Sequence, residues 1–183
     1  MKVYVHLATG FEEVEALTVV DVLRRGKIGV ETVSVTGERT VIGAHDIPVM
    51  ADLLIEDGDY DSCDMMVFPG GLPGTTNLAD HEGLLRHLRD FMEAGKWLVA
   101  ICAAPIIFGE LGLLDGRKAV CYPGMERHLY GADIQNTNVV VDGNYITSKG
   151  PATAMEFALK LVEVLAGENA AKEVAKGLLL ELE

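Results

Sequence analysis

The sequence predicts an α/β fold, a three-layer α/β/α sandwich around a mostly parallel sheet. Two observations lead to it. Strand-like and helix-like segments alternate along the chain, which favours parallel pairing, and several strands are continuous apolar runs, which indicates that both sheet faces are covered. The chain has 183 residues without repeats or linkers, so we expect a single domain, 1–183. In such sheets, ligands bind at the carboxyl ends of the strands.

The first half of the chain supplies strands, one helix and a small hairpin. Residues 2–8 form an apolar run typical of a buried strand. Residues 11–25 have helical spacing and are followed by a glycine, which predicts a helix and its end. A second strand is expected at 30–35, and two short β pieces in 40–50 predict a β-hairpin excursion. The strand at 65–68 stops at a Pro-Gly-Gly turn.

The second half continues the alternation. Residues 82–94 place leucines and aromatic residues at helical spacing, with a glycine just beyond. The apolar segment 97–101 predicts another buried strand, and a helix should begin at about residue 103. The remaining expected elements are strands near 118–121, 137–141 and 144–147, then helices at 152–166 and from 168.

Composition excludes several classes of partner. With 28 acidic and 15 basic side chains, the formal net charge is −13, and a field of that sign repels nucleic acid and anionic membranes. No apolar stretch approaches about 18 residues and the N-terminus lacks a signal-peptide pattern, so we expect a cytoplasmic protein. The three cysteines have no disulfide or metal-ligand spacing, which predicts no metal site.

Cys102 is the candidate nucleophile. It ends a predicted buried strand and is followed by small residues before the next helix, as in a nucleophile elbow. The amides and the dipole of a helix N-terminus would lower the pKa of the thiol and could stabilise an oxyanion. The alternative is a small buried cysteine at a strand end, a frequent role for free cysteine.

Glu15 is the candidate proton carrier. It falls inside the apolar arc of the first predicted helix, between Val22 and Val19, whereas Glu13 projects to the opposite, polar side. Burial would raise the pKa of the Glu15 carboxyl, so that it could hydrogen-bond to a thiolate and move a proton. The alternative is a carboxylate that reaches the helix edge or pairs with an arginine.

Two further features bear on the site. The turn containing Gly70 and Gly71 follows a buried strand, and its amides could face Cys102 as oxyanion donors. The five histidines are scattered without ligand spacing, and His6, inside the first strand, is interpreted as structural.

Five segments together resemble the ThiJ/PfpI family, in the branch of the parkinsonism-associated deglycase and the bacterial YajL protein. They cover essentially the whole chain: ATGFEEVEA (8–16), VDVLRRGKIGV (20–30), DMMVFPGGLPGTTNL (64–78), LVAICAAP (98–105) and ITSKGPATAMEFAL (146–159).

The resemblance implies a flavodoxin-like fold, a homodimer and a cysteine enzyme without a cofactor. Its nucleophile maps to Cys102, its protonated glutamate to Glu15, and its backbone donors to Gly71 and Ala103. The implied substrates are small carbonyl compounds: 2-oxoaldehydes (glyoxalase III type) or their early glycation adducts (deglycase type).

Two departures qualify this inference. Ala103 stands where peptidases and amidotransferases of the family carry a histidine, which makes acyl transfer less favoured. Tyr122 stands where close relatives often have a histidine, so Glu15 is left as the main proton carrier, with Tyr122 as a substrate-binding candidate. The alternative function is a redox-responsive stress protein or chaperone whose Cys102 is oxidised to a sulfinate.

Overall fold

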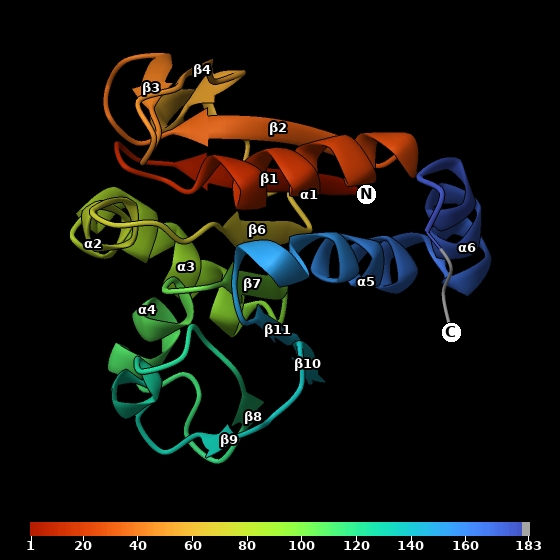
Figure 1. Ribbon diagram of the computed structural model, residues 1–183. Coiled ribbons are helices and arrows are strands. Elements are labelled where there is room, and N and C mark those ends of the chain that lie inside the picture. Colours follow the sequence, from red (N-terminus) through yellow and green to blue (C-terminus); the bar gives the residue numbers. More distant parts are fainter. Residues whose placement is uncertain (181–183) are drawn as a thin grey trace.

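The computed structural model describes residues 1–180, and its centre is a seven-stranded sheet in the order β10-β11-β7-β6-β1-β2-β5 (Figure 1). Every neighbouring pair is parallel except β10 and β11, which run antiparallel. The strands are β1 (Lys2–Leu7), β2 (Gly29–Ser34), β5 (Leu53–Leu54), β6 (Met65–Phe68), β7 (Trp97–Ile101), β10 (Val139–Asp142) and β11 (Tyr145–Ser148).

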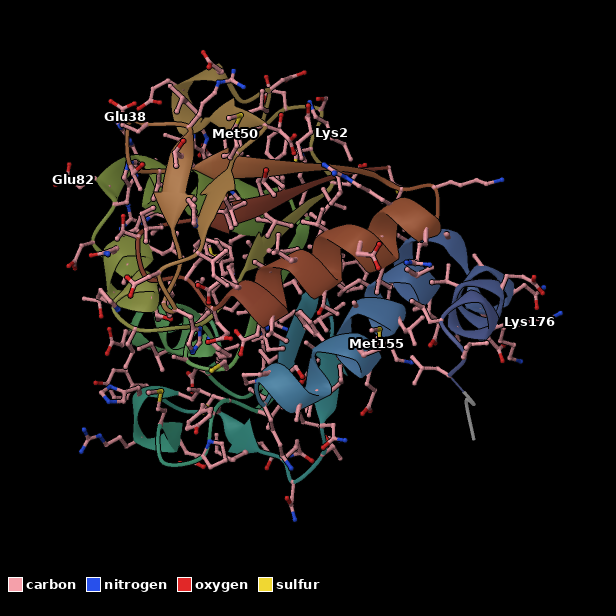
Figure 2. The ribbon with its side chains drawn as sticks, turned by 45° about the horizontal axis from the view of Figure 1, so that its top comes forward. Lys2, Glu38, Met50, Glu82, Met155 and Lys176 are labelled. Carbon is pink, nitrogen blue, oxygen red and sulfur yellow. The ribbon has the colours of Figure 1, made fainter. Side chains whose placement is uncertain are left out.

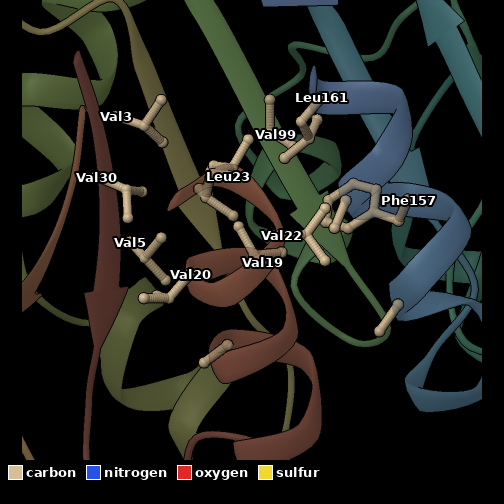
Figure 3. Packing of buried hydrophobic residues seen from close by; sticks show 14 of the residues in the cluster. Val3, Val5, Val19, Val20, Val22, Leu23, Val30, Val99, Phe157 and Leu161 are labelled. Atoms are coloured by element: carbon tan, nitrogen blue, oxygen red, sulfur yellow. The ribbon is translucent and has the colours of Figure 1, made fainter. Parts of the chain in front are cut away.

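Helices cover both faces of this sheet, which confirms the predicted three-layer sandwich. One buried cluster joins the sheet to α1, α5 and α6, and a second joins the opposite face to α2, α3 and α4. Figure 3 shows the first cluster, in which Val19 and Leu23 of α1 and Phe157 of α5 pack over β1 and β7. The helices are α1 (Glu13–Arg25), α2 (Gly74–Ala79), α3 (Glu82–Glu93), α4 (Pro105–Glu110), α5 (Ala154–Ala166) and α6 (Glu168–Gly177).

The predicted hairpin is also present, as β3 (Thr40–Ile42) paired antiparallel with β4 (Pro48–Met50). It is tied to the start of α1, because the Gly10 amide donates to the Ile42 carbonyl at 2.8 Å and the Ala44 amide to the Phe11 carbonyl at 2.8 Å. The Met50 side chain projects from it, 76% exposed (Figure 2). The hairpin therefore forms one wall beside the first turn of α1.

Several elements differ from the sequence prediction. The first helix begins at Glu13 rather than residue 11, since the Phe11 amide bonds to the Ala8 carbonyl in a turn. The helix after β7 likewise begins at Pro105, because the Ala104 amide closes a turn on Ile101. Three unpredicted elements are too short to show a period: α2, β5, and β9 (Asp133–Ile134), which pairs with β8 (Lys118–Ala119). Within residues 1–180, none of the helices has the length and hydrophobicity of a membrane span.

Candidate active site

Cys102 lies in a sharp turn at the carboxyl end of β7. Its backbone is left-handed, with φ of 65°, a conformation that is uncommon and strained for a residue with a side chain. Two hydrogen bonds hold it there: its amide donates to the Ser148 carbonyl at 2.9 Å, and its carbonyl accepts from the Tyr122 amide at 2.7 Å. The residue is 8% exposed. Strands β7 and β11 and the segment after β8 thus fix the thiol at one edge of the sheet.

Glu15 meets this thiol from the first turn of α1. The residue is completely buried, and its Oε2 accepts a hydrogen bond from the Gly70 amide at 2.7 Å. A Cβ added to Gly70 would lie 2.9 Å from that Oε2 and 3.0 Å from the Cys102 sulfur. Carboxyl and thiol therefore both pack against Gly70, on the side where any side chain at this position would collide with them. Among the described residues, the other carboxyl oxygen, Oε1, has no hydrogen-bond partner.

Burial dominates the protonation of the pair. It raises the pKa of Glu15 to about 7, against the opposing effects of the Gly70 amide and the Cys102 thiol. Burial is also the largest of the causes that raise the pKa of Cys102 to about 12. The charge of Glu15 and its hydrogen bond with the thiol raise this pKa too, whereas the amides of Ala103 and Gly71 lower it. The expected lowering of the thiol pKa is therefore wrong for the state with ionised Glu15.

The physical reason lies in the partner and in the helix. A carboxylate beside the sulfur disfavours a second negative charge, so the pair retains one proton between them once the pH exceeds the Glu15 pKa of about 7. When that proton resides on Glu15, the carboxylate charge that opposes the thiolate disappears. The helix that was expected to favour the thiolate begins only at Pro105 and has six residues, which leaves the nearest amides as the main backbone contribution.

The amides of Gly70 and Gly71 in the glycine turn have different partners. Gly70 donates to Glu15, so the expectation that its amide faces an oxyanion is wrong. The Gly71 amide, like the Ala103 amide, lies close to the Cys102 sulfur and lowers the pKa of the thiol. At Gly71 the backbone is left-handed, with φ of 89°, and a Cβ there would lie 2.5 Å from the Glu12 nitrogen. Glycine at 71 is required by both conformation and close approach.

Tyr122 also reaches the site, together with a residue that sequence reasoning missed. A Cβ added to Gly150 would lie 3.3 Å from Cδ2 of the Tyr122 ring and 4.0 Å from the Cys102 sulfur. Gly150 follows β11, whose carboxyl end lies beside that of β7. The available signal was a glycine just after a predicted strand, at the sheet edge where ligands bind.

Glu13 differs from its predicted place on the polar side of the helix. It is 4% exposed, because the hairpin covers the first turn of α1. Its carboxylate accepts the His45 amide at 2.8 Å and contacts the His45 Nδ1 at 2.7 Å. Glu12, Glu13 and His45 bring potential ligand atoms within 4.8 Å of one another. Since His45 already satisfies both oxygens of Glu13, we interpret the group as a structural clamp.

His6 has the structural role that its position in a strand indicated. It is completely buried, with Nδ1 3.3 Å from the Val67 carbonyl and Nε2 3.0 Å from the Tyr60 hydroxyl. Burial lowers the pKa of its imidazole to about 3, so it stays neutral. Its ring stacks on Phe68 and Tyr60 on the face of the sheet opposite α1.

Comparison with known proteins gives consistent matches over nearly the whole chain. A model of the DJ-1/PfpI family matches residues 1–164. Protein dj-1beta of Drosophila melanogaster is 39% identical over 176 residues, covering 95% of this chain and 94% of that protein. The glutathione-independent glyoxalase DJR-1.2 of Caenorhabditis elegans is 33% identical over 172 residues, covering 92% of this chain and 90% of that protein.

Solved structures agree with these matches. The structure of oxidized Toxoplasma gondii DJ-1 has a TM-score of 0.95 and 37% sequence identity, with 99% of each chain covered. Some relatives are longer. The chain spans 41% of DJ-1 homolog B of Arabidopsis thaliana, which is 37% identical over 180 residues, or 98% of this chain.

Proposed function

The chain belongs to the DJ-1/PfpI family, and on that premise we propose that it converts 2-oxoaldehydes to 2-hydroxy acids without a cofactor. One observation carries the proposal: a buried carboxyl with a pKa of about 7 faces a buried thiol at the sheet edge. Such a carboxyl can both accept and return a proton near neutral pH. The matched glyoxalase of C. elegans supports the same reaction class.

The first step forms a carbon–sulfur bond. The Cys102 sulfur adds to the aldehyde carbon, and its proton passes to the Glu15 carboxylate. The amides of Gly71 and Ala103, which already act on the sulfur, stabilise the resulting oxyanion. Protonation of that oxygen by Glu15 gives a neutral hemithioacetal and regenerates the carboxylate.

The second step moves a hydrogen between the two carbons. Glu15 takes the proton from the former aldehyde carbon and returns it to the adjacent carbonyl carbon, while the proton of the first oxygen passes to the second. The first carbon is oxidised to a thioester and the second is reduced to an alcohol, so no external oxidant is needed. Water then hydrolyses the thioester, which releases the 2-hydroxy acid and the thiol. Early glycation adducts are a related substrate class for the same pair of residues.

Turnover of methylglyoxal without glutathione or metal tests this proposal. We expect activity in the wild type and its loss in Cys102→Ser and Glu15→Gln. Cys121→Ser is the matched control, because Cys121 is also buried but belongs to the cluster on the other face of the sheet. Full activity of Cys102→Ser would contradict the mechanism.

A second candidate function, redox response, is favoured by the matched structure of an oxidized relative. A sulfinate on Cys102 would accept hydrogen bonds from protonated Glu15 and from the two amides. Mass spectrometry of Cys102 after graded peroxide, beside the turnover assay, separates the two functions. Negligible wild-type turnover with selective oxidation of Cys102 would favour the redox role, and a chaperone role would then need its own assay of client aggregation.

A further inference from the structure

His45 contacts the helix that carries Glu15 from a separate element of the fold. It lies in the loop between β3 and β4, and its Nδ1 is 2.7 Å from Oε2 of Glu13 and 3.8 Å from Oε2 of Glu12. Both glutamate side chains are largely buried, whereas that of His45 is 64% exposed. An imidazole that is open to solvent, and whose charge changes near neutral pH, therefore lies against two largely buried carboxyl groups.

Glu12 connects this contact to the reactive pair. Its amide donates to the Gly70 carbonyl at 2.9 Å, and the Gly70 amide donates to Oε2 of Glu15 at 2.7 Å, so one glycine binds both glutamates. Glu12, the N-cap residue of α1, is also three positions before Glu15, a spacing that makes side chains neighbours on a helix. Burial is the main cause that raises the pKa of Glu15 to about 7, and the charge of Glu12 adds to it. The Gly70 amide and the Cys102 thiol act in the opposite direction.

The charges that face His45 make its own ionisation part of this system. Its hydrogen bond with Glu13 is the main cause that raises the pKa of the imidazole above 6.5, and the charges of Glu12, Glu13 and Asp46 add to it. The imidazole therefore changes charge close to the pH at which Glu15 loses its proton. Protonated His45 attracts the Glu12 carboxylate and offsets its charge, which favours ionisation of Glu15. Neutral His45 leaves the charge of Glu12 unopposed, which disfavours that ionisation.

We propose that His45 is a positioning residue for the Glu15–Cys102 pair: acting through Glu12, its charge sets the pH at which Glu15 changes from proton donor to proton acceptor. The inference rests on the proposed function, in which Glu15 must both accept and return a proton. As the pH rises, loss of the imidazole charge makes Glu15 hold its proton more strongly. Two groups coupled in this way ionise over a wider pH range than one group alone. The donor and the acceptor form of Glu15 thus coexist over that wider range.

The test measures the ionisation of Glu15 directly, by NMR of protein that is isotope-labelled at its glutamate carboxyls. The Glu15 signal is the one that is absent from Glu15→Gln. We expect the pKa of Glu15 to be highest in His45→Gln, which is neutral at every pH, and lowest in His45→Lys, which stays charged, with wild type between them. The two variants should differ by about 0.2 to 0.7 in this pKa, the size of a partly screened charge interaction. Equal values or the reverse order would overturn the proposal.

A control variant and a change of salt separate charge from altered packing. His128→Gln is the matched control, because His128 also contacts a carboxylate, at 3.0 Å from Glu110 of α4, and it should leave the pKa of Glu15 unchanged. In about 1 M salt the screening length falls to about 3 Å, so the difference between His45→Gln and His45→Lys should shrink. A difference that is the same at low and high salt would overturn the charge effect.

Methylglyoxal turnover by the same proteins distinguishes this inference from the proposed function. The NMR titration needs no substrate, so turnover by wild type with equal Glu15 pKa values in the His45 variants would overturn this inference alone. Shifted pKa values without turnover in any protein would support the coupling of His45 to Glu15 and overturn only the proposed function. Where both hold, the pH profile of kcat/KM should shift in the same order as the pKa of Glu15.

Discussion

The raised pKa of Glu15 makes a prediction about stability that does not depend on substrate. The carboxyl is completely buried, and its pKa is about 7 in the folded protein against an ordinary value of 4.5. The unfolded chain therefore loses this proton at lower pH than the folded protein does. Folding stability should fall as the pH rises from 4.5 to about 7, and stay at the lower level above that.

The magnitude follows from the two pKa values. At about 1.4 kcal/mol per pKa unit, the ionised Glu15 lowers the free energy of unfolding at pH 8 by about 3 kcal/mol. Glu15→Gln removes the charge but retains an oxygen that can accept the Gly70 amide. We therefore expect this variant to match the wild type near pH 4.5, where the carboxyl is neutral, and to be more stable by up to about 3 kcal/mol at pH 8.

Urea unfolding followed by circular dichroism at pH 4.5, 6 and 8 measures these differences. Glu173→Gln is the matched control, since Glu173 is an exposed carboxyl on α6 and its substitution should have a small effect at every pH. The reasoning is refuted if the stability difference between Glu15→Gln and wild type does not grow with pH, or if the variant is less stable at pH 8.

Three further predictions concern the surroundings of the site. Gly70→Ala would place a Cβ 2.6 Å from that of Cys102, so it should destabilise the fold by about 1–3 kcal/mol and abolish methylglyoxal turnover, as unfolding and kinetic assays would show. The pKa of His45 is raised by Glu13. Burial opposes ionisation of Glu13, but its hydrogen bonds from His45 outweigh this and lower the pKa of the carboxyl. The pair stabilises the fold while Glu13 is ionised and His45 is protonated, and this stabilisation is lost as the pH rises through the His45 pKa. His45→Ala should therefore reduce the free energy of unfolding more at pH 6 than at pH 9. An equal loss at both pH values would contradict the clamp. The homodimer implied by the family resemblance is a proposal that Met50→Asp tests. Met50 is 76% exposed, and a charge there should shift a dimer towards monomer in sedimentation analysis. An unchanged dimer would place the interface elsewhere.

Much of the fold follows from short-range patterns that the sequence displays directly. The apolar runs of β1, β6 and β7 and the helical spacing of α3 and α5 depend on neighbours within one segment, so they could be read in order. The alternation of these strands and helices predicted the layers and the sheet edge that carries the site. The shortest elements, such as α2 and β9, escaped because two to six residues show no period, and their pairing depends on distant segments.

The chemistry divides in the same way. Sequence alone selected Cys102 by its place after a buried strand and Glu15 by its place in an apolar arc, because each signal is local. Only the tertiary structure showed that the Gly70 amide donates to Glu15 and that Gly150 lies beside the Tyr122 ring and the Cys102 sulfur. It also showed that burial and the facing carboxylate raise the thiol pKa. Desolvation and charge depend on atoms that lie far apart in the chain and meet only where the strands end together.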